Sequence, residues 1–198
     1  MAAVKLTKNE LKKQKDSLKR FQRYLPTLQL KKQQLQLVIR QVEAEEQELR
    51  RKQQALRDQL QHWIAVFGDE IDLAAYVQVD RVETETGNIA GVDVPVFKEL
   101  SFKDIEWNLL ETPLWIDKGI TALKELITFD AEVAVLQRRR KLLHDELRTT
   151  SQRVNLFEKV KIPESKENIR RIQIYLGDQQ TAAVVRGKMA KAKVVGAS

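Results

Sequence analysis

Hydrophobic residues recur every seven positions over the first third of the chain. The clearest row at this spacing is Phe21, Leu28, Leu35, Val42, Leu49, Leu56 and Trp63. A companion row, offset by four positions, is apolar at both ends but is interrupted by Lys32, Glu46 and Gln53. Two such rows are typical of the a and d positions of a coiled coil. They predict an N-terminal helix over residues 1–68, on the order of 90 Å long, which no single compact core would enclose.

Two residue patterns bear on the first part of this helix. Thr7 and Glu10 form a capping box, in which the Thr7 hydroxyl accepts a hydrogen bond from the Glu10 amide and Glu10 reaches back. Pro26 lacks an amide proton and should kink the helix. A helix that ends near Tyr24 and restarts is the alternative. We favour the kink, because the heptad phase continues across the proline.

A second helix is predicted over residues 113–191, followed by a frayed tail at 192–198. It begins at Thr112-Pro113, an N-cap residue followed by proline at the first helical position. Apolar residues then recur at intervals of three and four, and the two helices are expected to pair in antiparallel orientation. The predicted seam between them consists of Leu18, Phe21, Leu25, Leu28, Leu35, Val42, Leu49, Leu56, Trp63, Leu143, Leu147 and Val154.

Residues 69–112 change character, because apolar residues there alternate at period two over 76–82 and 92–97. Thr86-Gly87-Asn88 and Gly91 supply residues suited to a turn between two strands. Pro95 is expected on an edge strand. The predicted fold class is therefore mainly α, a long antiparallel coiled coil of N- and C-terminal helices with a small β-hairpin-containing head that caps one end.

Charge is distributed unevenly along the chain, whose overall net charge is +7. Residues 1–40 and 118–198 are strongly basic, whereas residues 41–117 are acidic. In an antiparallel hairpin both termini would lie at one end and form a basic tip, and the two ends should meet different partners. The predicted partner-binding residues of this tip are Lys8, Lys12, Lys13, Lys15, Lys19, Arg20, Arg186, Lys188 and Lys191.

The same folding back places an acidic cluster of the first helix beside a basic run of the second. Counting from the head, Glu46 should face residues 134–139. We therefore predict ion pairs between the helices that involve Glu43, Glu46, Arg138 and Arg139. Such pairs would explain the polar interruptions of the heptad row and would fix the register of the two helices.

The sequence offers little for catalysis. Cysteine is absent, which excludes thiolate chemistry and suits a reducing compartment. The two histidines, His62 and His144, lie on separate predicted helices without a metal-binding spacing, and no phosphate-binding loop is present. No apolar run is long enough to span a bilayer, and no secretory signal is seen. We expect a non-catalytic, cytoplasmic protein without a cofactor or metal.

The chain resembles the D subunits of V-type (A/V-type) ATP synthases, which form the central rotor shaft. The resemblance rests on several motifs that follow one another along the chain in the family's order. The family likeness covers nearly the whole chain, and the proline at position 26 points to a bacterial, chlamydial-like branch. The residues that carry the likeness are 6–11 (LTKNEL), Lys31-Lys32, 88–95 (NIAGVDVP), 112–117 (TPLWID), 153–158 (RVNLFE), Ile162-Pro163, and Arg186 with Lys188.

The resemblance implies a function and a set of partners. The paired termini would insert into the hexamer of catalytic A and non-catalytic B subunits. The F subunit would bind along the shaft, and the funnel-like subunit known as C or d would link it to the proteolipid ring, peripheral to the inner membrane. The chain would transmit torque, with no nucleic acid bound and no direct membrane span. The residues themselves leave two other classes open, a cytoplasmic coiled-coil adaptor and a basic-tipped nucleic-acid-associated protein.

Overall fold

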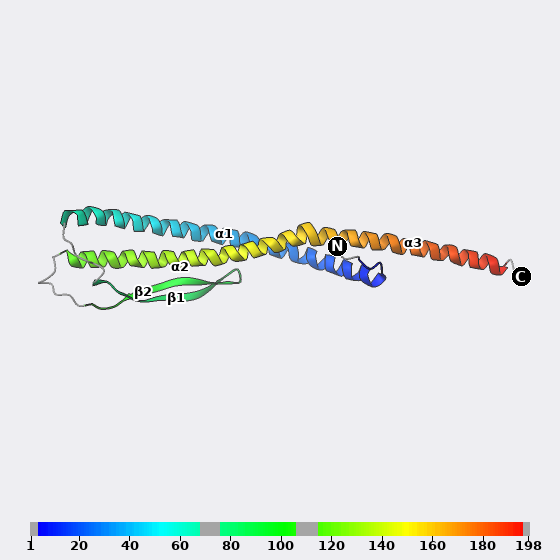
Figure 1. The fold of residues 1–198 in the computed structure, drawn as a ribbon, viewed down its shortest axis with the longest axis horizontal. Coiled ribbons are helices and arrows are strands. Elements are labelled where there is room, and N and C mark those ends of the chain that lie inside the picture. The colour runs from blue at the N-terminus through cyan, green and yellow to red at the C-terminus, as the bar shows by residue number, and fades with distance from the viewer. Residues whose placement is uncertain (1–3, 68–75, 106–114, 196–198) are drawn as a thin grey trace. The chain divides into compact units, whose positions relative to one another are not determined.

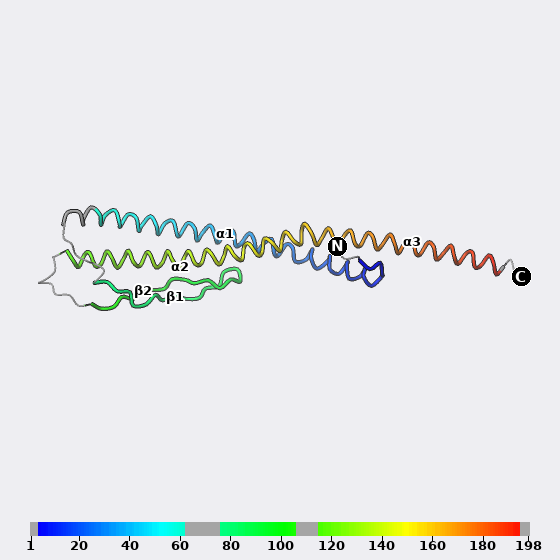
Figure 2. The backbone as a smooth tube through the Cα atoms, in the orientation of Figure 1, coloured from blue at the N-terminus to red at the C-terminus, as the bar shows by residue number. Residues whose placement is uncertain are grey.

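Along the sequence, one β-hairpin separates two long helical segments, and in space it lies beside them (Figures 1 and 2). The computed structural model describes residues 4–67, 76–105 and 115–195. The predicted fold class, mainly α with a small β-hairpin between two long helical segments, is confirmed. The elements are, in order, α1 (Lys8–Phe67), β1 (Val79–Ile89), β2 (Val92–Phe102), α2 (Ile116–Asn155), the π-helix η2 (Leu156–Lys161) and α3 (Ile162–Val195).

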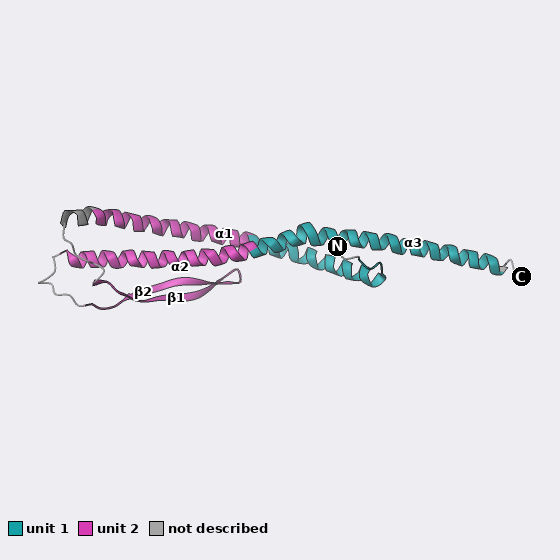
Figure 3. Cartoon of the chain, in the orientation of Figure 1, with its two compact units in different colours: residues 1–32, 149–198 teal, residues 33–148 magenta. Residues whose placement is uncertain are grey.

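The chain divides into two compact units, shown in Figure 3. Unit 1 combines residues 1–32 with 149–198, and unit 2 is residues 33–148. The predicted segments 1–68, 69–112, 113–191 and 192–198 follow the order of elements along the sequence and stay a prediction about domains. Each compact unit instead combines stretches of both helical segments, because paired helices contact each other rather than their own continuation.

Helix α1 begins as the capping pattern indicates. The Glu10 amide donates to the Thr7 Oγ1 at 3.3 Å, and the Leu11 amide donates to the Thr7 carbonyl at 3.0 Å. Glu10 does not complete the box, since its Oε1 accepts a hydrogen bond from Gln14 instead. The helix continues through Pro26 to Phe67, so the alternative of a helix that ends near Tyr24 is wrong.

The return segment changes its hydrogen bonding just before Pro163. In η2 the chain forms a π-helix, and the amide of Ile162 donates to the carbonyl of Phe157, five residues back. The physical reason is the proline, whose ring would clash with the carbonyl four residues earlier and which has no amide to donate. Widening the turn accommodates both restrictions. Thr112-Pro113, the predicted start of this segment, lie outside the described residues, and α3 runs on to Val195.

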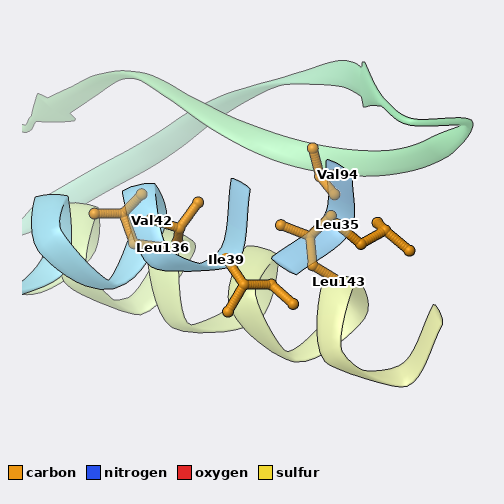
Figure 4. Packing of buried hydrophobic residues seen from close by; sticks show 6 residues of the cluster. All are labelled: Leu35, Ile39, Val42, Val94, Leu136 and Leu143. Carbon is orange, nitrogen blue, oxygen red and sulfur yellow. The ribbon is translucent and has the colours of Figure 1, made fainter. Parts of the chain in front are cut away.

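Unit 2 is held together by hydrophobic contacts of the hairpin with both helices (Figure 4). One cluster consists of Leu35, Ile39 and Val42 of α1, Val94 of β2, and Leu136 and Leu143 of α2. A second cluster joins Val77 to Ile116 and Ile120, with Phe102 packed against it. The hairpin therefore packs along the sides of the paired helices, near its turn through the first cluster and near the end of β2 through the second. The expectation that it caps the end of the helices is wrong.

The hairpin turn lies at Ala90-Gly91, where both φ angles are positive, 52° and 77°. Ile89 pairs with Val92 across it, so the loop has two residues, and a two-residue turn with these angles matches the twist of the strands. Of the residues predicted to supply the turn, Gly91 does form it, whereas Thr86, Gly87 and Asn88 are paired in the ladder. Pro95 pairs with Thr86 in a sheet of two strands, as expected for an edge position.

Substituting two glycines by alanine should have opposite effects on stability. Gly91→Ala should lower the free energy of unfolding by about 1 kcal/mol, because φ is 77° and an L side chain is strained there although the space is open. Gly177→Ala, in α3 and also with open space, should raise it by roughly 0.5–1 kcal/mol through helix propensity. Urea unfolding followed by circular dichroism measures both. If both substitutions changed the free energy of unfolding in the same direction, the backbone argument would be contradicted.

In unit 1 the start of α1 runs antiparallel to η2 and α3. The ring centroids of Phe21 and Phe157 lie 5.1 Å apart. Further towards the start of α1, Gln14 and Ser17 line a cavity of about 190 Å³ together with Ser165 and Asn168 of α3. This register places the beginning of α1 close to the turn of α3 around Ile172, which is fully buried.

Helix α3 therefore continues well beyond the start of α1 (Figure 1). From Gly177 to Val194 every residue is exposed except the half-buried Ala182. These last residues of the helix, 177–195, measure about 28 Å at the usual rise per residue. We call them the projecting segment. The start of α1 and the end of α3 are thus not level with each other, in contrast to the single tip predicted from the sequence.

Candidate functional site: polar layers and partner-binding surfaces

The two units carry opposite net charge. Unit 1 contains 20 basic and 6 acidic residues, a formal net charge of +14, whereas unit 2 contains 15 basic and 22 acidic residues, a net charge of −7. Charges of this size attract partners of opposite sign and repel those of the same sign. Each unit therefore favours a different class of partner surface.

The predicted basic-tip residues occupy two separate places in unit 1. All nine are exposed, and among the described residues none of them forms an ion pair with a carboxylate. Six lie on the first turns of α1, beside η2 and the first half of α3. Arg186, Lys188 and Lys191 lie on the projecting segment, beyond the start of α1. The structure does not bring the two sets together.

The projecting segment also exposes apolar side chains. Val184, Val185 and Met189 are each about half exposed, at 58%, 49% and 54%. They alternate with the cations of the same helix turns, so the segment is both basic and apolar on its surface. A single helix with this composition is better stabilised inside a socket that buries the apolar groups than in water.

In unit 2 the polar interruption of the heptad row at Glu46 is an inter-helix network. Arg50 donates two hydrogen bonds to Glu46 Oε1, at 3.0 and 2.9 Å, and Gln137 of α2 donates to the same oxygen at 3.3 Å. Arg140 Nη1 lies 2.8 Å from Glu46 Oε2. The Glu46 side chain is only 5% exposed. One buried carboxylate thus joins two helices through three polar partners.

The pKa of Glu46 reflects this network. Burial alone would raise the pKa of the carboxyl group, because it disfavours the charged form. The hydrogen bonds from Arg50 and Gln137 and the charges of Arg140 and Arg50 outweigh that effect and hold the pKa below its ordinary value. Glu46 is therefore a carboxylate at neutral pH.

A second polar layer lies one heptad further along α1. The buried Gln53 donates to Asp130 Oδ1 of α2, and Arg57 Nη2 lies 3.6 Å from Asp130 Oδ2. Both layers interrupt an apolar seam at a positions, where a polar pair specifies which residues lie opposite each other. Arg140 belongs to the basic run that was expected beside Glu46. Gln137 and Asp130 were missed from the sequence, because only the register between the helices identifies them.

The predicted ion-pairing residues lie where the acidic cluster of α1 meets the basic run of α2. Their individual partners differ from the predicted ones. Glu43 lies 3.6 Å from the ring of His144, and Arg139 lies 3.9 Å from Glu45. Arg138 is exposed, and no ion pair to it is found within the described part of the chain. The ionic partner that α2 supplies to Glu46 is Arg140 rather than Arg138 or Arg139.

The predicted seam residues are covered to different extents. The side chain of Trp63 lies outside the part of the chain whose side chains are described. The fully buried members are Leu35, Val42, Leu143 and Val154. The half-buried members are Leu18, Phe21, Leu25, Leu28, Leu49, Leu56 and Leu147.

The described residues offer no arrangement of three or more His, Asp or Glu side chains that could hold a metal ion. His144 lies beside Glu43, and the side chain of His62 is not described. Among the described helices, none is long and apolar enough to cross a membrane.

Known proteins similar to this chain share one description. A sequence model of the family of ATP synthase D subunits matches residues 10–192. The V-type ATP synthase D subunit of Borreliella burgdorferi is 52% identical over 195 residues, which cover 98% of this chain and 96% of that protein. The V-type ATP synthase D subunit of Chlamydia muridarum is 38% identical over 141 residues, 70% of each chain. The chain belongs to the family of ATP synthase D subunits.

Proposed function

We propose that this chain is the central-stalk subunit of a V-type ATP synthase or ATPase. In this role it transmits torque between ATP turnover in a hexamer of A and B subunits and ion translocation in the membrane sector. The observation that carries the proposal is the projecting segment, an exposed, basic and partly apolar helix end that requires a socket. Family membership supports it, because the matching relatives are named as subunits of a V-type ATP synthase.

The mechanism follows from asymmetry. A shaft inside a ring of three catalytic interfaces contacts each of them differently. Each interface is then biased towards a different nucleotide affinity, and rotation of the shaft exchanges the three states. The chain itself makes and breaks no covalent bond. Its net charge in unit 2, opposite to that of unit 1, suits further partners, for which we propose the F subunit and the C (or d) subunit that joins the proteolipid ring.

Direct observation of rotation tests this function. The A/B hexamer is fixed to a surface and a bead is attached to this chain at an exposed residue of the hairpin, such as Lys98. With ATP the bead should turn in one direction, in steps of a third of a turn. ATP hydrolysis with a stationary bead would overturn the proposal.

Truncation tests the role of the projecting segment. A chain that ends at Gly177 should keep its stability within about 0.5 kcal/mol, because residues 178–194, which it removes, are almost entirely exposed. Its affinity for the A/B hexamer should fall at least about tenfold. Biolayer interferometry with immobilised hexamer measures the affinity. An unchanged affinity would show that the socket does not hold this segment.

A further inference from the structure

A groove in unit 2 lies between β2 and the two helices. Its volume is about 280 Å³, enough for one long side chain. Leu49 of α1, Phe97 of β2 and the buried Leu136 of α2 form apolar walls. We call this space the β2 groove. All of its lining residues belong to unit 2.

Three carboxylates line the β2 groove: Glu45 and Glu48 of α1 and Glu132 of α2. Two cations line it as well: Lys52 lies 2.9 Å from Glu48, and Arg139 lies 3.9 Å from Glu45. Glu132 has no cationic partner among the described residues. The groove thus has one more negative than positive charge, within a unit of net charge −7.

The pair formed by Arg139 and Glu45 is loose. Its 3.9 Å separation is beyond hydrogen-bonding distance, and the buried Nε of Arg139 has no hydrogen-bond partner. Glu45 therefore retains acceptor capacity, in addition to the unpaired Glu132. Two carboxylates beside apolar walls fit an amphipathic cation, whose methylene stem covers the walls while its charged head meets the carboxylates.

We propose that the β2 groove receives a lysine or arginine side chain from another subunit of the complex. The proposal rests on the proposed function, because it takes the occupant from a neighbouring subunit. A metal ion is a poorer fit, since the described carboxylates are not arranged as a ligand set. A purely apolar occupant would cover Glu132 without supplying a counter-charge, at a cost in desolvation.

Photo-crosslinking in the purified native complex tests the proposal. The probe p-benzoylphenylalanine replaces Val96, which lines the groove and is 37% exposed. Val82, 43% exposed on β1 and outside the groove lining, is the control position. From Val96 the crosslink should join a different subunit within about two residues of a lysine or arginine, and Val82 should not give this product.

Charge reversal adds the decisive step. Glu132→Lys should lower the crosslink yield at least about tenfold, and changing the identified partner cation to glutamate should restore it. Glu125→Lys, at an exposed position of the same helix, should leave the yield unchanged. A crosslink only to a second copy of this chain, a yield insensitive to Glu132→Lys, or no crosslink would each overturn the proposal.

The same preparation separates the two proposals. If the tagged chain does not co-purify with the large nucleotide-binding subunits, the proposed function fails. If it co-purifies but Val96 reaches no basic segment of another subunit, the β2 groove proposal alone fails.

Discussion

Replacing Leu143 by alanine should lower the free energy of unfolding by about 3 kcal/mol. The side chain is fully buried, and it contributes to the cluster that joins α1, α2 and the hairpin. The substitution removes its apolar contacts and leaves a cavity, because a close-packed core relaxes only in part. Urea unfolding followed by circular dichroism measures the effect.

Leu142→Ala is the matched control. Leu142 precedes Leu143 on the same helix, but it is 37% exposed. The chemical change and the change in helix propensity are identical, so its effect should stay below about 1 kcal/mol. If both variants lost the same stability, packing in this cluster would not be the cause.

The Leu143 variant should also loosen the hairpin, because Val94 belongs to the same cluster (Figure 4). Amide hydrogen exchange across β2 should therefore accelerate in Leu143→Ala and not in Leu142→Ala. Unchanged protection of β2 would mean that the hairpin is held by its other contacts, those around Ile116 and Ile120.

The heptad rows predicted the seam because their period is a direct consequence of helix geometry. Residues at the d positions such as Leu35 and Val42 must face a partner helix if they are to be buried at all. The position of Glu46 in this seam also predicted a charged partner from the other helix. Its identity did not follow, because one residue of register rotates the facing side chain by about 100°.

Three features depended on tertiary structure that the sequence pattern does not contain. Gly87-Asn88 is a strong turn signal, yet the turn is formed by Ala90-Gly91. We attribute this to packing, because Ile89, Ala90 and Val92 contact the cluster around Leu35. The offset between the start of α1 and the end of α3 was also missed, although the predicted helices differed in length, because both ends were expected to form one tip. The β2 groove could not be predicted, because it requires three separate segments.

Replacing Glu46 by lysine should lower the free energy of unfolding by about 3 kcal/mol. The change puts an ammonium group where Arg50 and Arg140 approach from two sides, in a position that is almost fully buried. We expect the lower end of the range for a broken buried pair, because both arginines are partly exposed and can turn towards water. Thermal and urea unfolding report the loss.

Glu46→Leu should behave differently. A leucine at this a position restores the apolar row, so stability should stay within about 1 kcal/mol of the original chain or rise. The helices should then lose part of their register specificity. Disulfide crosslinking between cysteines introduced at positions 39 and 144 tests this, because slipped registers would change the yield. A leucine variant as unstable as the lysine variant would contradict the electrostatic argument.

The pH dependence of stability isolates the carboxylate. Because the folded pKa of Glu46 is below its ordinary value of 4.5, its charged network stabilises the fold fully above that pH, and the contribution is lost as pH falls through the folded pKa. The difference in stability between the original chain and Glu46→Gln should therefore be constant at neutral pH and shrink below about pH 4.5.

Glu48→Gln is the control. Lys52 holds the pKa of Glu48 below its ordinary value too, but Glu48 is exposed, so any effect of its replacement should disappear in high salt, whereas that of Glu46 should persist.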